Sequence, residues 1–342
     1  MVNPRVTLLL LFSILFTAIS LGVVAGNVMT DRTFGLFTST ASVPGNTFTT
    51  AASFARKPMR LATGTYTGNG SDNRGFTGLG FQPDVVMVKI STATSGVIRT
   101  SSMVGDASKP LTLVGALQPN MVQTLDSDGF TVGTDTRVNA SASTYYWVAM
   151  KAGSELKLGS YVGNGADNRS ITGVGFQPDW VITLGDGDDS VFRPRTLAGD
   201  ASFLFDGTTS LVDHIQALEV DGFQIGTNIK VNETGTTFHY VAWKVSANVK
   251  QTTYAGNGAD NRSIIGVGFQ PLMVWVKRDS LNQSTWRSAS TVGDLAHHWG
   301  GTASAVDRIQ ALEADGFQVG TSALVNSSTA TYHYIAFKDG GP

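Results

Sequence analysis

Three copies of one polar segment contain the side chains best suited to bind a ligand. The segment reads GNGSDNR from Gly68, GNGADNR from Gly163 and GNGADNR from Gly256, and we call these the GNG segments. Their amide, carboxylate and guanidinium groups can hydrogen-bond sugar hydroxyls or a partner chain, and glycine lets a ligand approach the backbone closely. The candidate binding residues are Asn69, Asp72, Arg74, Asn164, Asp167, Arg169, Asn257, Asp260 and Arg262.

The same segments also have a purely structural interpretation. Asn-Gly between strand-forming residues is a strong β-hairpin signal. Asp and Asn close turns by hydrogen-bonding nearby backbone, and an Asp paired with the Arg two residues later would brace the loop. A turn that the fold requires recurs as faithfully as a binding site. We therefore favour the turn and keep binding as the alternative.

Patterns typical of catalysis and metal binding are missing from the sequence. The chain has no cysteine, which excludes disulfides, thiol catalysis and cysteine-ligated metals. It also lacks the G-x-S-x-G, H-E-x-x-H and P-loop motifs. The acidic stretches DSDG from Asp126 and DGDD from Asp186 lack the twelve-residue spacing of a calcium loop. We expect a non-enzyme without a resident metal or cofactor, and calcium is the alternative.

Other recurrent polar residues are expected to be structural. An arginine stands seven residues before a Gly-Asp aspartate in each copy, and we expect it to reach that carboxylate or a neighbouring carbonyl. Pairs of acids recur at one tight hairpin, and three identical active sites on one chain would be unusual. Asn-x-Ser/Thr triplets matter only in a host that glycosylates exported proteins. The arginines are Arg99, Arg193 and Arg287, and the triplets begin at Asn139, Asn232 and Asn326.

Composition narrows the range of partners. Charged residues make up 15% of the chain, the net charge is −2, and no run of lysine or arginine occurs. This pattern argues against binding to nucleic acids or acidic lipids. Abundant Gly, Ser, Thr, Asn and Val favour short strands and tight turns.

The N-terminus is typical of an exported protein. One arginine precedes an uncharged apolar run, Val6–Val24, which ends in small residues at Ala25. We interpret residues 1–25 as a secretory signal helix, with an uncleaved membrane anchor as the alternative. A Thr/Ser-rich segment, residues 26–60, follows. The protein is expected to be secreted and to act at the cell surface or in a matrix, contacting a membrane only through the apolar run if uncleaved.

Three long repeats fill the rest of the chain. Repeat 1 spans residues 61–151, repeat 2 spans 157–246 and repeat 3 spans 250–338. A period of about 94 residues exceeds that of solenoid units, so each repeat should be a complete domain. The linkers are short, which places neighbouring repeats close together in a semi-rigid rod or a compact stack. We favour the rod.

Within each repeat the patterns predict strands. Apolar runs follow a proline, and an Asp-Gly turn joins two strands in VQTLDSDGFTVGT and its two copies. In the closing strand of repeat 1, Tyr146, Val148 and Met150 share one face, and Tyr145, Trp147 and Ala149 share the other. Both faces are apolar, as expected for a central strand covered on both sides. The predicted fold is all-β, with three tandem antiparallel β-sandwich (jelly-roll or lectin-like) domains after the signal helix.

The repeats resemble a β-sandwich module of phage tail and appendage proteins and of secreted bacterial proteins. The resemblance rests on Gly175-Phe176-Gln177-Pro178-Asp179, on the Gly-Phe hairpin from Asp221 to Gly226, and on the aromatic closing strands. It implies fold and setting more than activity. The repeats are also distantly similar to H-type lectin domains, in the Gly-Phe hairpin and the aromatic closing strand.

The segment from Phe34 to Ala51, FGLFTSTASVPGNTFTTA, resembles the mature start of camelysin/TasA-type matrix and fibre proteins. That resemblance implies export and a strand lent to a neighbouring subunit. Charged Asp31 and Arg32, and Ala52 where glycine is usual, depart from the pattern. The candidate assembly residues are Phe34, Leu36, Phe37, Phe48 and Phe54.

Together these patterns predict an exported structural or adhesive protein that self-assembles into filaments through its N-terminal strand. Its main partner would be a second copy of itself. The alternative is a multivalent lectin-like protein whose three weak sites bind surface glycans through avidity.

Overall fold

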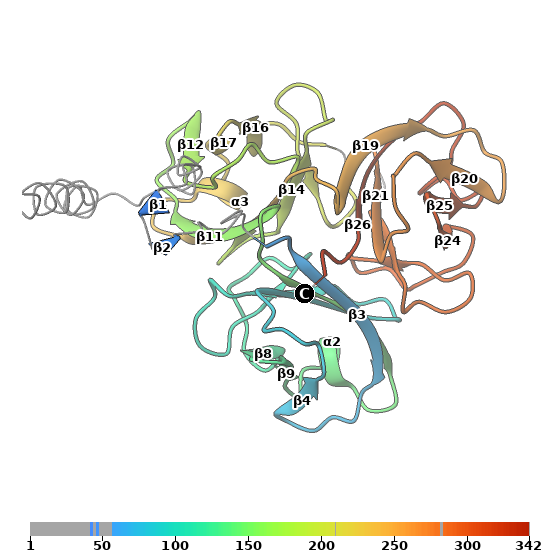
Figure 1. Ribbon diagram of the computed structural model, residues 1–342, viewed down its shortest axis with the longest axis horizontal. Helices are drawn as coiled ribbons and strands as arrows, with labels where there is room; N and C mark the ends of the chain where they lie inside the picture. The colour runs from blue at the N-terminus through green and yellow to red at the C-terminus, as the bar shows by residue number, and fades with distance from the viewer. Residues whose placement is uncertain (1–41, 44–45, 48–56, 209, 281–282, 342) are drawn as a thin grey trace, which may run out of the picture. The chain divides into compact units, whose positions relative to one another are not determined.

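The computed structural model describes residues 42–43, 46–47, 57–208, 210–280 and 283–341. The chain divides into two compact units, Met1–Arg56 and Lys57–Pro342, and all three repeats lie in the second (Figure 1). Within the first unit, the described residues form a short antiparallel pair, β1 (Ser42–Val43) with β2 (Asn46–Thr47). The expected signal segment and the five candidate assembly residues lie outside the described residues. No described helix is long and apolar enough to cross a membrane.

Each repeat contains one five-stranded and one three-stranded antiparallel sheet. In repeat 1 the orders are β3-β10-β5-β6-β7 and β4-β9-β8, and the other repeats follow the same plan. The elements of repeat 1 are β3 (Arg60–Thr67), β4 (Arg74–Thr77), β5 (Val85–Ile90), β6 (Val97–Thr100), β7 (Lys109–Pro110), β8 (Val122–Asp126), β9 (Gly129–Val132), α2 (Thr136–Asn139) and β10 (Thr144–Lys151).

The elements of repeat 2 are β11 (Leu156–Val162), β12 (Arg169–Thr172), β13 (Trp180–Gly185), β14 (Val191–Pro194), β15 (Phe203–Leu204), β16 (Ile215–Glu219), β17 (Gly222–Ile225), α3 (Ile229–Asn232) and β18 (Thr237–Trp243). Those of repeat 3 are β19 (Val249–Ala255), β20 (Arg262–Ile265), β21 (Met273–Arg278), β22 (Thr285–Ser288), β23 (His297–His298), β24 (Ile309–Glu313), β25 (Gly316–Val319) and β26 (Thr331–Phe337). The expected tandem antiparallel β-sandwich fold is confirmed.

The closing strand lies where its two apolar faces predict. β10 pairs with β3 on one side and β5 on the other. Tyr145 and Ala149 face the core between the two sheets of repeat 1, where Trp147 packs against them. Tyr146, Val148 and Met150 belong to a different, larger core. The five-stranded sheet is therefore covered on both faces, as the sequence indicates.

That larger core is shared by all three repeats. It contains aromatic and aliphatic side chains from every five-stranded sheet, among them Met87, Ile98, Tyr146, Trp180, Phe192, Trp243, Trp275, Trp286, Trp299 and Phe337. The rings of Trp180 and Trp275 lie 4.9 Å apart and join repeats 2 and 3. Those of Tyr146 and His297 lie 4.0 Å apart and join repeats 1 and 3. The expected rod is therefore wrong, because repeat 3 packs against repeat 1 as well as repeat 2.

The segments between the repeats also meet, so the second unit closes on itself. The Ser154 amide donates to the Lys57 carbonyl, and the Lys338 amide donates to the Asn248 carbonyl. Arg60 at the start of repeat 1 forms an ion pair with Asp339 after repeat 3, with Nε and Oδ1 separated by 3.0 Å. Both ends of the second unit are thus held by contacts within that unit.

The Asp-Gly hairpins form as predicted, but the Asn-Gly hairpins do not. β16 pairs with β17 across the turn, with Glu219 opposite Gly222. A Cβ at Gly222 would lie 1.9 Å from the Ile171 carbonyl oxygen, so this position requires glycine. The strands flanking the first Asn-Gly, β3 and β4, belong to different sheets. Each GNG segment is therefore a crossover between the two sheets, because its flanking strands find better partners in β10 and β9.

Candidate functional site

The GNG segments lie at the surface, and a buried asparagine anchors each one. In repeat 2 the anchor is Asn232, which is fully buried at the end of α3. Its side-chain oxygen accepts from the Asn164 amide at 3.0 Å, and its Nδ2 donates to the Ala166 and Gly226 carbonyls. Asn139 and Asn326 make the equivalent contacts in the other repeats. Complete burial of all three also keeps these asparagines away from a glycosylating enzyme.

The arginine of each segment packs inward and does not pair with the aspartate. Arg169 Nη1 donates to the Val162 carbonyl at 2.6 Å and to Asn232 Oδ1 at 3.3 Å. Its guanidinium lies over the Tyr161 ring, 5.5 Å from the centroid. Arg74 and Arg262 repeat this arrangement. The expected Asp-to-Arg brace is wrong, because a backbone carbonyl and an aromatic face occupy the guanidinium.

The aspartates of the GNG segments hydrogen-bond a glutamine and an asparagine instead of the arginine. Asp167 Oδ1 accepts from Gln216 Nε2 at 2.9 Å, and its other oxygen accepts from Asn168 Nδ2 at 2.9 Å. Asn168 adopts a positive φ of 54°, which asparagine tolerates better than most residues. Asp72 and Asp260 bind the corresponding glutamines Gln123 and Gln310. The structure therefore brings the three candidate residues of each repeat into one exposed loop, where each of them binds neighbouring backbone or side-chain groups and not another candidate residue.

We expect the buried anchor to matter far more for stability than the exposed aspartate. Changing Asn232 to alanine leaves the buried Gly226 carbonyl without its partner and also frees the part-buried Ala166 carbonyl and Asn164 amide, which should lower the free energy of unfolding by about 2–3 kcal/mol. Changing Asp167 to alanine should cost no more than about 0.5–1 kcal/mol, because the group is exposed. Urea denaturation measures both. An equal loss in the two variants would contradict this division between anchor and exposed rim.

The paired acids of the Asp-Gly hairpins hold a loop in place. Asp221 accepts backbone hydrogen bonds from Gly173 at 3.1 Å and Gly175 at 2.6 Å. Asp128 and Asp315 do the same for the matching glycines. One acid of each pair is thus committed to the backbone, which explains why GVGF and DGF recur together.

The three recurrent arginines bind carbonyls, as expected. Arg99 Nη2 donates to the Gly105 carbonyl and Nη1 to the Ala107 carbonyl, and Arg193 and Arg287 make matching contacts. Burial lowers the pKa of Arg99, and the nearby Asp106 carboxylate opposes that shift. These arginines tie the loop after β6 and its equivalents to the sheet, and none forms an ion pair with the Gly-Asp carboxylate.

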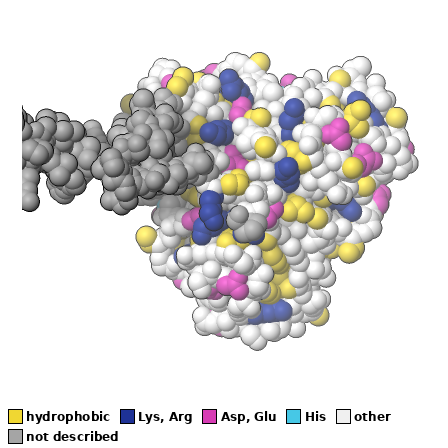
Figure 2. Space-filling model, in the orientation of Figure 1, with side chains coloured by type: hydrophobic (Ala, Val, Ile, Leu, Met, Phe, Trp, Pro, Cys, Tyr) yellow, Lys and Arg dark blue, Asp and Glu magenta, His cyan; other side chains and the backbone are white. Residues whose placement is uncertain are grey.

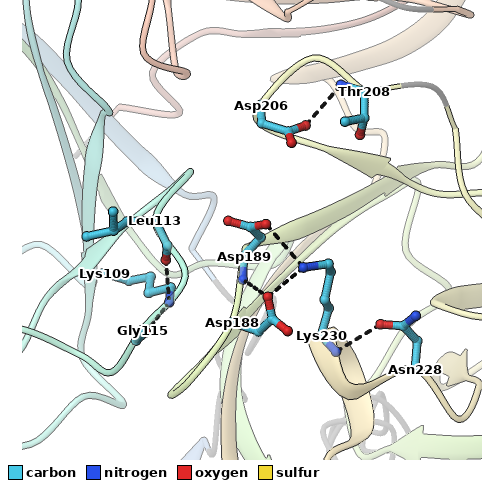
Figure 3. A network of polar contacts seen from close by, with 9 residues as sticks. All are labelled: Lys109, Leu113, Gly115, Asp188, Asp189, Asp206, Thr208, Asn228 and Lys230. Atoms are coloured by element: carbon cyan, nitrogen blue, oxygen red, sulfur yellow. Dashed lines mark hydrogen bonds and ion pairs between the residues drawn. The ribbon is translucent and has the colours of Figure 1, made fainter.

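The acidic stretch DGDD takes part in a contact between repeats 1 and 2. Lys230 Nζ lies 2.5 Å from Asp188 Oδ1 and 3.1 Å from Asp189 Oδ2 (Figure 3). Asp186 accepts from the Leu117 amide of repeat 1 at 2.7 Å. Lys109, also of repeat 1, donates to the Leu113 and Gly115 carbonyls, and burial lowers its pKa to about 8 (Figure 3). The described residues contain no group of three His, Asp or Glu side chains placed to hold a metal ion.

Buried histidines lie at the contacts between repeats, and the sequence did not predict this role for them. His239 Nδ1 lies 2.8 Å from Ser102 Oγ of repeat 1, and His333 Nδ1 lies 2.7 Å from Thr196 Oγ1 of repeat 2. Both histidines occupy the closing-strand position of Tyr146, whose ring meets His297 of repeat 3. An aromatic ring recurs at this position in all three closing strands, and that recurrence is the sequence signal for these contacts. The ring recurs because this face of each closing strand packs against another repeat.

The comparisons with known proteins identify a family. The domain of unknown function DUF7483 matches residues 61–156 and again residues 244–342, which together form more than half of the chain. The chain therefore belongs to the DUF7483 family. The two matches cover repeats 1 and 3, and repeat 2 between them has the same sheets and anchors. Comparison with curated proteins gave no significant match.

Proposed function

We propose that this DUF7483 chain is an exported, non-catalytic structural or adhesive protein of the cell surface or extracellular matrix. Residues 57–342 act as one globular head, and the residues before them export it and link it to neighbouring copies. The proposal extends to assembly through the Thr/Ser-rich segment, which adds a strand to an open sheet edge of another subunit.

The observation that carries this proposal is the use of the repeated polar residues. The asparagine, arginine and Asp-Gly aspartate of each repeat hold its own loops, as Asn232, Arg193 and Asp221 do in repeat 2. Most side chains with catalytic potential are thereby committed to structure. Residues 57–342 then present a broad outer surface around one shared core. Such a surface is better suited to binding another molecule than to catalysing a reaction.

Assembly should depend on the N-terminal segment. We compare a chain that starts at Gly26 with one that starts at Lys57, by size-exclusion chromatography and electron microscopy. The shorter chain begins at Lys57 because Met59 is fully buried in the shared core. Fibres or large oligomers from the longer chain alone are expected. Two monomeric proteins of equal stability would contradict assembly through this segment.

The second candidate function is multivalent glycan binding. It is favoured by the display of one exposed Asn/Asp loop three times on a single body, which multiplies weak affinities. A glycan array with the Lys57 chain and with its Asp72→Ala, Asp167→Ala, Asp260→Ala variant tests it. Glycan signals lost in the folded variant would support the lectin, and an array without signals would count against it.

A further inference from the structure

The segments between repeats gather lysines that lie far apart in the sequence. The linkers 152–156 and 245–249, the entry at 57–59 and the C-terminal residues 339–341 contact one another in a closed series. The Lys244 amide donates to the Glu155 carbonyl, and the Gly340 amide donates to the Met59 carbonyl. Asn248 Nδ2 donates to Glu155 Oε1 at 3.1 Å. Seven cations lie in these gathered segments or within two residues of them, and we call them the basic pole: Lys57, Arg60, Lys151, Lys157, Lys244, Lys250 and Lys338.

The carboxylates near the pole keep their charge but bind groups other than its lysines, and the seven cations outnumber them. Glu155 is 1% exposed and accepts from Ser154 and Asn248. Asp339 pairs with Arg60 and accepts from the Leu61 amide. Asp84 and Asp179 accept from the linker amides of Ala152 and Val245. Within the described part of the chain, none of the six lysines of the basic pole has a carboxylate within ion-pair distance.

The six lysines of the basic pole lie near the surface and none of them is buried. All six are exposed or half-buried. The ammonium Nζ atoms of Lys244 and Lys338 lie over the Phe176 and Phe269 rings, 5.1 Å and 5.3 Å from the centroids. These cation–π contacts hold both charges in place without neutralising them. Figure 2 shows Lys and Arg side chains around the middle of the face on which Figure 1 marks the C terminus, with some acidic groups between them.

We propose that the basic pole docks the three-repeat unit onto a lipid surface with anionic headgroups. The choice of a membrane rests on chain connectivity, because Lys57 lies in this pole and is where the N-terminal segment with its apolar run Val6–Val24 joins the unit. A chain held by that run keeps the unit tethered to the bilayer, which raises the local concentration of anionic headgroups around the pole. Dispersed lysines attract anionic headgroups as a linear basic segment does, provided that they lie within a Debye length of the surface.

The test is co-sedimentation of residues 57–342 with vesicles of phosphatidylcholine alone or mixed with phosphatidylglycerol. Binding is expected only to the anionic vesicles and is lost in high salt. The variant Lys151→Gln, Lys244→Gln, Lys338→Gln should partition on the order of 100-fold more weakly, since each lysine near the surface contributes roughly fivefold. The matched control Thr77→Glu, Thr172→Glu, Ile265→Glu changes the net charge equally at exposed sites on the three-stranded sheets and should bind nearly as well as the parent.

Three results would overturn the proposal: equal binding to both vesicle types, an equal loss in both variants, or retention by an acidic polysaccharide column without vesicle binding. Circular dichroism shows that each variant is folded before it is compared. The proposal takes export from the proposed function, but the measurement uses purified components. A negative result here therefore leaves assembly through the N-terminal segment untouched, and failed assembly leaves membrane docking untouched.

Discussion

Changing Trp275 to alanine will lower the stability of all three repeats together. Trp275 is 1% exposed in β21, and its ring lies 4.9 Å from those of Trp180 and Phe192 in repeat 2 and 6.2 Å from that of Trp299. Removing a buried indole leaves a cavity that the neighbouring rings cannot fill, which typically costs about 3–5 kcal/mol. Because the cavity opens in the shared core, the loss reaches beyond repeat 3.

Amide hydrogen exchange distinguishes a shared core from three independent domains. In the Trp275→Ala protein we expect faster exchange in β10 of repeat 1 and β18 of repeat 2 as well as in β26. The matched control is Phe317→Ala, which removes a fully buried ring from the core between the two sheets of repeat 3. Its effect should concentrate in repeat 3. Unchanged exchange in repeat 1 of the Trp275→Ala protein would mean that the repeats are energetically independent.

Acid will destabilise the contacts between repeats before the protein meets strongly acidic conditions. Burial, together with the positive charges of Lys89 and Arg287 and the neighbouring His298, lowers the pKa of His297 to about 3. Burial and the charges of Arg308 and Lys89 together lower the pKa of His298 to about 4, although the hydrogen bond with the Ser284 carbonyl opposes the shift. The pKa of His333 also falls to about 4, through burial and Lys277, although Asp279 opposes the shift.

The sign of the pH effect follows from these directions. A histidine in the unfolded chain has a pKa near 6.5. Below that pH the unfolded chain binds protons at positions where the folded chain keeps the imidazole neutral, so protonation favours unfolding. The free energy of unfolding is therefore unaffected by protonation of these histidines above pH 6.5, and it falls as the pH drops from 6.5 toward their pKa values in the folded protein. Each histidine can cost up to about 2.7 kcal/mol at pH 4.5, from 1.36 kcal/mol per unit of separation. We expect a clear drop in the urea midpoint between pH 7 and pH 4.5.

Repeat 2 offers a matched control for the acid effect. β15 has Phe203 and Leu204 where β23 has His297 and His298, in the same register against the neighbouring strand. The variant His297→Phe, His298→Leu should therefore keep the fold and lose less stability on acidification than the parent. An unchanged pH profile in this variant would show that other groups govern acid unfolding.

Much of the local structure could be read from the sequence because it depends on short spacings. The alternation of Tyr145 and Tyr146 predicts a strand with two buried faces, and both faces are buried in the structure. The Asp-Gly turns predict hairpins, because glycine alone avoids the clash at Gly222 and Gly316. Recurrence of the arginines predicts a structural role, which their carbonyl contacts confirm. The binding role of the GNG segments stays a prediction.

Contacts between distant parts of the chain decided the rest. The Asn-Gly signal predicts a hairpin, but β3 gains a longer partner in β10, so the GNG segment crosses between sheets. An apolar strand face predicts that the face is buried but does not predict which element covers it. The second apolar face of each closing strand therefore could not show that the three repeats share a core. The lysines of the basic pole stand one or two to a linker and form no run in the sequence. Our proposal of anionic-lipid docking therefore departs from the expectation drawn from the sequence, which weighs only cations that are neighbours along the chain.

The sequence by itself determined the repeats, their strands and their turns, because these depend on residues a few positions apart. Only the tertiary structure decided that three sandwiches share one core and that their linkers form one charged surface. The physical reason is that burial and electrostatic attraction depend on distance in space, and the closing of Lys57–Pro342 on itself brings together residues that the chain keeps about 90 positions apart.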